Sequence, residues 1–186
     1  MYKICQTEQS YKRQRSIEQG LLHLMLKHRY EDISISDLCA HLQIPRKTFY
    51  RYFSGKDGVL YAMLDHTMMD FQMADFLPIQ NNHATPGDLT KYFFFWYTNK
   101  DLLTALDRSN LNGLLVERAT SFALQEKMMP RYMLKWEQSM QQLAMSFTIS
   151  GLMSMVLRWH QQGYLLTPEE MSQAATQLLT NPLISR

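Results

Sequence analysis

Hydrophobic residues recur every three or four positions along most of the chain, which is the spacing of one face of an α-helix. The first such stripe lies within residues 10–28 and consists of Ile17, Leu21, Leu24 and Met25. Alternation of apolar and polar residues, the pattern of a strand, is confined to the short run DISISD at 32–37. The sequence therefore predicts an all-α protein.

Capping sequences divide this pattern into about nine helices. A Ser or Thr followed three residues later by Asp or Glu forms a capping box, which marks a helix start. Three of these boxes precede predicted helices, at Ser34/Asp37, Thr85/Asp88 and Thr167/Glu170, and Gly163 is placed as a helix stop. The predicted helices cover about 10–28, 34–41, 45–52, 56–75, 86–99, 100–109, 110–126, 130–162 and 167–179.

The segment RKTFYRYFSGKDGVL, residues 46–60, interleaves cations with aromatic rings. It follows a short helix and a tight turn, which together form the layout of a helix-turn-helix. Phe49 and Phe53 are four residues apart and should pack inward. The other face offers groups that can meet phosphates and base edges in the major groove: Arg46, Lys47, Thr48, Tyr50 and Arg51. Lys56 begins the next helix, where its ammonium and free N–H groups can clamp a phosphate.

Charge is distributed unevenly along the chain. Residues 1–60 carry ten Lys or Arg against six Asp or Glu, a net charge of +4, whereas residues 61–186 carry nine against eleven, a net charge of −2. A basic front half is typical of a domain that binds a polyanion. The basic run 11–15 (YKRQR) is either a solvated, frayed helix end or a contact to the DNA backbone or minor groove.

The stretch SISDLCAHLQIPRKTFYRYFSGKDGVL, residues 34–60, resembles the helix-turn-helix of the tetracycline-repressor (TetR) family. The resemblance implies phosphate contacts from Ser34, Tyr50 and Lys56. It also implies a dimeric repressor of a palindromic operator, in which a ligand bound by the C-terminal domain shifts the two DNA-reading heads. Three positions depart from the family pattern, namely Gln43 for a turn glycine, Pro45 for a capping serine, and Lys47 for a small residue.

We therefore expect residues 1–55 to form a three-helix DNA-binding domain. Residues 56–186 would form a helical regulatory and dimerisation domain, and helix 56–75 would connect the two. The aromatic residues at 93–97 cover more than one face of their helix, so they either fill the core or line a ligand pocket. The candidates for the pocket are Phe93, Trp96, Tyr97, Met133, Trp136 and Met140.

The segment 146–163 is apolar around most of its circumference, which is more than one core-facing stripe requires. Together with the last helix it predicts a four-helix dimer interface. The candidates for this interface are Phe147, Ser150, Met153, Ser154, Leu157, Met171, Ala175 and Leu178.

The leading hypothesis is a cytoplasmic, homodimeric DNA-binding repressor that a small, largely apolar or aromatic ligand releases from its operator. The alternative keeps DNA binding but gives the C-terminal domain a protein partner of the co-activator type. No nucleophile–base constellation, phosphate loop or metal-like spacing points to an enzyme, a cofactor or a metal site. No apolar run approaches the roughly 18 residues that span a bilayer, so we expect no membrane insertion.

Overall fold

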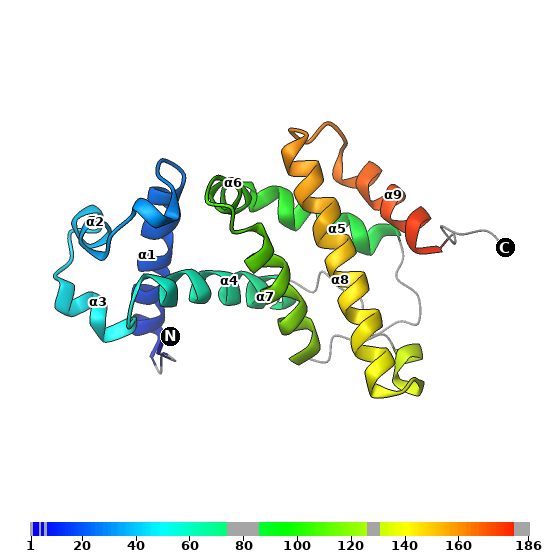
Figure 1. Ribbon diagram of the computed structural model, residues 1–186, viewed down its shortest axis with the longest axis horizontal. Helices are drawn as coiled ribbons and strands as arrows, with labels where there is room; N and C mark the ends of the chain where they lie inside the picture. The colour runs from blue at the N-terminus through cyan, green and yellow to red at the C-terminus, as the bar shows by residue number, and fades with distance from the viewer. Residues whose placement is uncertain (1, 4, 6, 74–85, 126–130, 181–186) are drawn as a thin grey trace. The chain divides into compact units, whose positions relative to one another are not determined.

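The computed structural model describes residues 2–3, 5, 7–73, 86–125 and 131–180. In these ranges the chain forms nine α-helices, two short 3₁₀-helices and one isolated bridge between Tyr2 and Phe53 (Figure 1). The prediction of an all-α fold is confirmed. The chain divides into two compact units, one of Met1–Thr67 with Thr104–Leu111, the other of Met68–Leu103 with Asn112–Arg186.

The first unit contains α1 (Glu8–Met25), the 3₁₀-helix η1 (Tyr30–Asp32), α2 (Ile35–His41), α3 (Arg46–Tyr52) and most of α4 (Lys56–Met73). Helix α1 packs on α2, and α2 packs on α3. The core consists of side chains with no exposed surface, among them Ile17, Leu21, Leu38, Phe49, Phe53 and Leu64. Burial of each such side chain stabilises the unit by about 1.5–3 kcal/mol relative to exposure.

Gly20 allows α1 to approach the end of α2 closely. A Cβ at this position would lie 2.7 Å from Leu42 Cδ2 and within 2.9 Å of two further atoms of the same side chain. These distances are too short for unstrained carbon contacts, so the absence of a side chain at position 20 sets the packing distance here.

The turn between α2 and α3 is a Schellman motif. Gln43 adopts a left-handed conformation (φ 53°) and its N–H donates to Ala40 C=O, while Ile44 N–H donates to Cys39 C=O at 3.0 Å. Glycine is the residue best suited to this conformation, so Gln43 occupies it at a cost in strain. Pro45 precedes α3 as its N-cap with extended backbone (ψ 143°), although it was predicted inside the first turn.

The second unit contains α5 (Pro86–Thr98), the start of α6 (Lys100–Arg108), α7 (Asn112–Gln125), η2 (Arg131–Lys135), α8 (Gln138–Gln161) and α9 (Pro168–Thr180). Helix α5 packs on α9, and α7 packs on α8. Trp159 is buried among aromatic rings, with ring centroids 5.8 Å from Phe93, 6.0 Å from Tyr97 and 4.8 Å from Tyr164. This cluster joins α5 to the C-terminal end of α8.

Two predicted capping features are confirmed in this unit. Thr167 N–H donates to the Glu170 carboxylate at 2.7 Å, and Glu170 N–H donates to the Thr167 hydroxyl at 3.3 Å. Gly163 follows the C-cap of α8 with φ 70°. The predicted box at Thr85/Asp88 lies outside the residues whose side chains are described.

The prediction of one continuous eighth helix from residue 130 is wrong. The segment 131–135 forms η2, and α8 begins only at Gln138, with Glu137 extended as its N-cap (ψ 148°). Met133 is buried, and the Gln141 side-chain amide donates to Trp136 C=O at 2.8 Å. Burial of Met133 and this side-chain bond stabilise a corner where helical periodicity alone predicts continuity.

Candidate nucleic-acid interface

Helix α3 has two chemically distinct faces. Phe49 and Phe53 have no exposed surface and their ring centroids lie 5.8 Å apart, so the predicted inward packing is confirmed. The remaining positions that were predicted to contact DNA lie on the solvent side, with Arg46, Lys47, Tyr50 and Arg51 exposed and Thr48 half-buried. The buried aromatic pair fixes the helix on the core, and the cations remain available to a partner in solution.

Arg46 and Tyr50 lie one turn apart and contact each other. The Arg46 Nη2 donates to the Tyr50 hydroxyl at 3.3 Å, and the guanidinium lies 5.9 Å from the centre of the ring. This hydrogen bond raises the pKa of the Arg46 guanidinium above its ordinary value, so the group stays charged. The contact restricts both side chains and presents a cation and a ring together at the surface.

Ser34 is exposed at the N-terminus of α2, in the capping box that the sequence predicted. Its hydroxyl accepts the Asp37 N–H at 3.1 Å, and the Asp37 carboxylate accepts the Ser34 N–H at 2.8 Å. Hydrogen bonds to its carboxylate from the Ser34 side chain and from the Ser34 backbone N–H lower the pKa of Asp37. The Ser34 oxygen therefore accepts within the box, and a phosphate would compete with the Asp37 carboxylate for the Ser34 O–H.

Lys56 is engaged inside the first unit. Its ammonium donates to Tyr30 C=O and Ile33 C=O at 2.5 Å each, approaches Glu31 C=O at 3.4 Å, and lies 4.2 Å from the centre of the Tyr30 ring. Burial lowers the pKa of Lys56. The side chain therefore holds the carbonyls of the turn that leads into α2, a positioning role that the sequence did not indicate.

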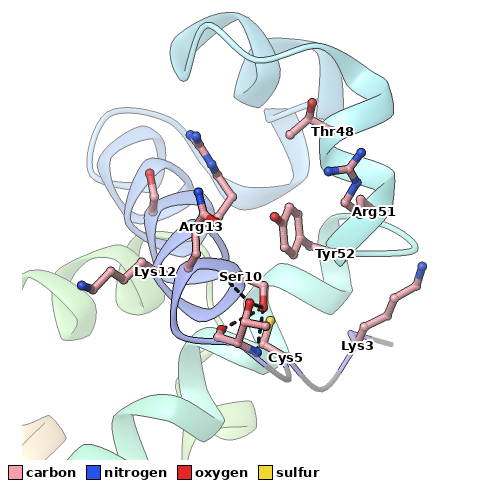
Figure 2. A pocket seen from close by; sticks show the side chains of 11 residues that line it. Lys3, Cys5, Ser10, Lys12, Arg13, Thr48, Arg51 and Tyr52 are labelled. Carbon is pink, nitrogen blue, oxygen red and sulfur yellow. Dashed lines mark hydrogen bonds between the residues drawn. The ribbon is translucent and has the colours of Figure 1, made fainter.

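A groove of about 860 Å³ lies between the N-terminal segment, α1 and α3 (Figure 2). Its lining carries four cationic side chains and no carboxylate. The lining residues are Lys3, Cys5, Thr7, Gln9, Ser10, Lys12, Arg13, Ser16, Thr48, Arg51 and Tyr52. The basic run 11–15 lies within α1, and two of its cations, Lys12 and Arg13, line this groove.

The six residues predicted to form a ligand pocket are only partly brought together. Trp96 lines an apolar cavity of about 40 Å³ in the second unit, whereas Phe93 and Tyr97 contact Trp159 instead. Met133 is buried in η2, and Trp136 and Met140 are exposed. The cavity is lined by Met68, Phe71, Tyr92, Trp96, Ala119, Phe122, Ala123, Ile149, Leu152 and Met153. This volume has room for a few atoms only.

The residues predicted at a dimer interface also divide into two groups. Phe147 is 74% exposed and Leu178 is 49% exposed, and Ser154 is exposed as well. Ser150 and Leu157 are half-buried. The other three candidates, Met153, Met171 and Ala175, are buried within the unit.

Helix α8 is long and apolar enough to cross a membrane by length and composition. This is weak evidence, because the core helix of a soluble protein passes the same test. Within the described ranges, no group of three or more His, Cys, Asp or Glu side chains could hold a metal ion.

Residues 20–63 match the family model described as "Bacterial regulatory proteins, tetR family". No curated protein sequence matched the chain. Several crystal structures are similar in fold. A TetR transcriptional regulator from Streptococcus agalactiae 2603V has a TM-score of 0.64 at 15% identity, covering 93% of this chain and 96% of its own.

Two other similar structures carry functional names. The dihydroxyacetone kinase operon activator DhaS has a TM-score of 0.56 at 18% identity, covering 89% of this chain and 93% of its own. The TetR family repressor AlkX from Dietzia sp. strain DQ12-45-1b has a TM-score of 0.54 at 20% identity, covering 89% and 92%. At these identities the likeness establishes the fold, which extends over both units.

Proposed function

We propose that the chain is a transcriptional regulator of the TetR family, which binds a palindromic DNA operator as a homodimer and represses transcription until a ligand releases it. The observation that carries this proposal is the division of α3 into a buried aromatic face and an exposed cationic face. We assign DNA binding to residues 1–55 and regulation with dimerisation to 56–186, with α4 connecting them. The protein acts in the cytoplasm, without catalysis.

In the proposed complex, α3 enters the major groove of DNA. Arg46, Lys47 and Arg51 bring cations to phosphates and guanine edges, and Tyr50 and Thr48 contribute hydroxyls. Ser34 donates its hydroxyl to a phosphate at the start of α2. Lys56 has a positioning role within the protein, because its hydrogen bonds to two carbonyls hold the turn that precedes Ser34. A phosphate contact by Lys56 would require it to exchange one of these carbonyls.

Two arguments support dimerisation, namely the exposed apolar surface and the small size of the recognition helix. The exposed apolar side chains of α8 and α9, including Phe147 and Leu178, offer area for a second copy of this chain. One recognition helix of seven residues contributes little affinity, whereas two tethered heads bind two half-sites with high effective concentration.

The effector is proposed to be small and largely apolar or aromatic, because the cavity beside Trp96 is lined by apolar side chains. At about 40 Å³ that cavity must enlarge before it can admit such a molecule. The small volume also favours the second candidate, a regulator whose C-terminal domain binds a protein partner. The name of DhaS, an operon activator, shows that this fold also serves activation.

Fluorescence anisotropy tests the DNA-binding proposal. The purified protein is titrated onto labelled DNA from upstream of its own gene and onto a scrambled duplex, at two salt concentrations. We expect tighter binding to the upstream DNA, weakened by salt, with Tyr50→Ala and Lys47→Ala reducing it. Phe94→Ala, an exposed aromatic on α5, serves as the matched control. Binding that is equally weak on both duplexes and indifferent to the α3 variants would contradict the proposal.

A ligand screen then separates the two candidates for regulation. The readout is release of the upstream DNA by aromatic and apolar small molecules, compared between wild type and Trp96→Ala. Release that Trp96→Ala abolishes supports the small-molecule effector. A screen without any active compound, together with a protein that copurifies stoichiometrically, supports the partner-binding alternative.

A further inference from the structure

Three residues before α1, namely Tyr2, Lys3 and Cys5, form an N-terminal segment that is bonded to the helices around the groove. Lys3 N–H donates to Tyr52 C=O at 3.1 Å, and Tyr2 pairs with Phe53 as an isolated antiparallel bridge. The Tyr2 hydroxyl donates to the Asp65 carboxylate at 2.8 Å. The segment is thus attached both to the end of α3 and to α4.

Gln14 on α1 provides a second attachment from the opposite wall. Its side-chain amide donates to Lys3 C=O at 3.0 Å and accepts from the Cys5 thiol at 3.2 Å. Gln14 is only 1% exposed, so these are the bonds that satisfy a buried amide. Lys3 is therefore held at a defined place, although it lies near the start of the chain.

The groove that this segment borders is cationic and open to a partner. Lys3, Lys12, Arg13 and Arg51 are all exposed along it. Lys12 pairs with Glu8 at 2.6 Å, whereas no carboxylate of the described residues lies within ion-pair distance of Lys3, Arg13 or Arg51. Figure 2 shows Arg13 on the α1 side of the groove and Tyr52 on the α3 side, with Lys3 on the same side as Arg51.

We infer that this groove binds the sugar–phosphate backbone of DNA next to the major groove that α3 occupies. Lys3 and Arg13 contact phosphates, and Gln14 is a positioning residue that holds Lys3 in place. The inference rests on the proposed DNA-binding function and extends its contact surface beyond the helix-turn-helix. Continuity favours DNA over a free anion, because Thr48 and Arg51 belong both to the groove and to the face of α3.

The salt dependence of DNA binding tests the phosphate contacts. Wild type, Lys3→Gln and Arg13→Gln, each with its purification tag at the C-terminus, are titrated onto the upstream and scrambled duplexes between 50 and 200 mM salt. Each lost phosphate contact should reduce the slope of log K against log[salt] by about 0.9. The loss should be equal on both duplexes, because phosphates carry no sequence information. Lys27→Gln, an exposed lysine of the same unit outside the groove, should leave the slope unchanged.

The role of Gln14 is tested by a double-mutant cycle. Gln14→Met keeps the volume and every charge but removes both bonds to the N-terminal segment. We expect weaker DNA binding and faster hydrogen exchange at the Lys3 amide. Lys3→Gln should then have little further effect in the Gln14→Met background, because the lysine has already lost its place. Additive effects of the two substitutions would overturn the positioning role. Circular dichroism confirms that each variant is folded.

The outcomes separate this inference from the proposed function. If Tyr50→Ala abolishes binding while Lys3→Gln and Arg13→Gln retain the wild-type slope, the groove inference is wrong and the function stands. If wild type binds neither duplex, the function itself fails. A thermal shift with inorganic phosphate that Lys3→Gln abolishes, with DNA binding unchanged, would assign the groove to a free anion and overturn the inference.

Discussion

Helices α3 and α8 expose opposite kinds of chemistry. Helix α3 has seven residues, buries Phe49 and exposes Tyr50 together with the cations Arg46, Lys47 and Arg51. Helix α8 has 24 residues and exposes large apolar side chains in its first half, with Met140 at 52%, Leu143 at 66% and Phe147 at 74%. Exposed cations are well solvated without a partner, whereas a run of exposed apolar side chains is a surface that association would stabilise.

This difference indicates two partners whose binding depends differently on salt concentration. Binding of a polyanion by α3 releases counterions and weakens as salt rises. Burial of Met140, Leu143 and Phe147 against apolar side chains depends on the hydrophobic effect, which salt does not screen. The same protein should therefore lose DNA in high salt while remaining associated through α8.

The largest expected effect comes from the buried face of α3. Phe49→Ala leaves every cation in place but creates a cavity in the first unit, and should lower the free energy of unfolding by about 3–5 kcal/mol. DNA binding should disappear with it. Phe94→Ala, which removes an exposed ring, should change stability by less than about 0.5 kcal/mol. Urea denaturation measures both. Equal effects would show that Phe49 does not anchor α3.

A charge placed on the exposed apolar side chains of α8 should weaken the proposed dimer. Phe147→Glu is expected to weaken self-association by about 30-fold or more, equivalent to about 2 kcal/mol. Sedimentation velocity at several protein concentrations measures it, with Gln142→Glu as a control of equal charge at an exposed position of the same helix. If the Phe147→Glu protein stays dimeric, the dimer interface does not include Phe147.

Lys56 differs from the exposed cations of α3, because its ammonium is hydrogen-bonded within the first unit. Lys56→Ala removes the donor to the Tyr30 and Ile33 carbonyls and should lower stability by about 1–2 kcal/mol even without DNA. Lys47→Ala, on the exposed face of α3, should weaken DNA binding with no measurable change in stability. Thermal unfolding of both variants distinguishes the two roles. If Lys56→Ala melts like wild type, the side chain does not support the turn.

The smallest expected effect concerns the turn that leads into α3. Gln43→Gly relieves the left-handed conformation at φ 53° and should stabilise the first unit by up to about 1 kcal/mol. The α8 surface should be unaffected, so self-association serves as the internal control. A destabilised Gln43→Gly protein would mean that the glutamine side chain contributes more than its backbone strain costs.

Local sequence rules predicted the parts of the fold that depend on neighbouring residues. The Ser34/Asp37 and Thr167/Glu170 boxes were predictable because cap and partner are three residues apart. The inward packing of Phe49 and Phe53 follows from helical spacing in the same way. The corner before α8 was missed, because it depends on burial of Met133 and not on a break in the local pattern.

The exposed residues of α3 were predictable from the sequence, whereas the contacts of Lys56 and Lys3 beside this helix were not. The carbonyls that Lys56 holds are more than 20 residues away in sequence, and no spacing rule connects them. Lys3 joins the groove only because Tyr52 and Gln14 hold it there. One signal existed for Gln14, which falls on the same helical face as Ile17 and Leu21. A polar side chain on a core stripe requires buried hydrogen-bond partners.

The contact between Gly20 and Leu42 constrains how this sequence can diverge. A Cβ at position 20 meets the Leu42 side chain within 2.7–2.9 Å, so a larger residue there requires this half-buried leucine to shift. A smaller residue at position 42 would first have to open the space, at the expense of core packing. The order of the two changes therefore decides how well the intermediate protein packs at this contact. Lineages of this chain should show epistasis between positions 20 and 42, with Gly20 retained wherever Leu42 is.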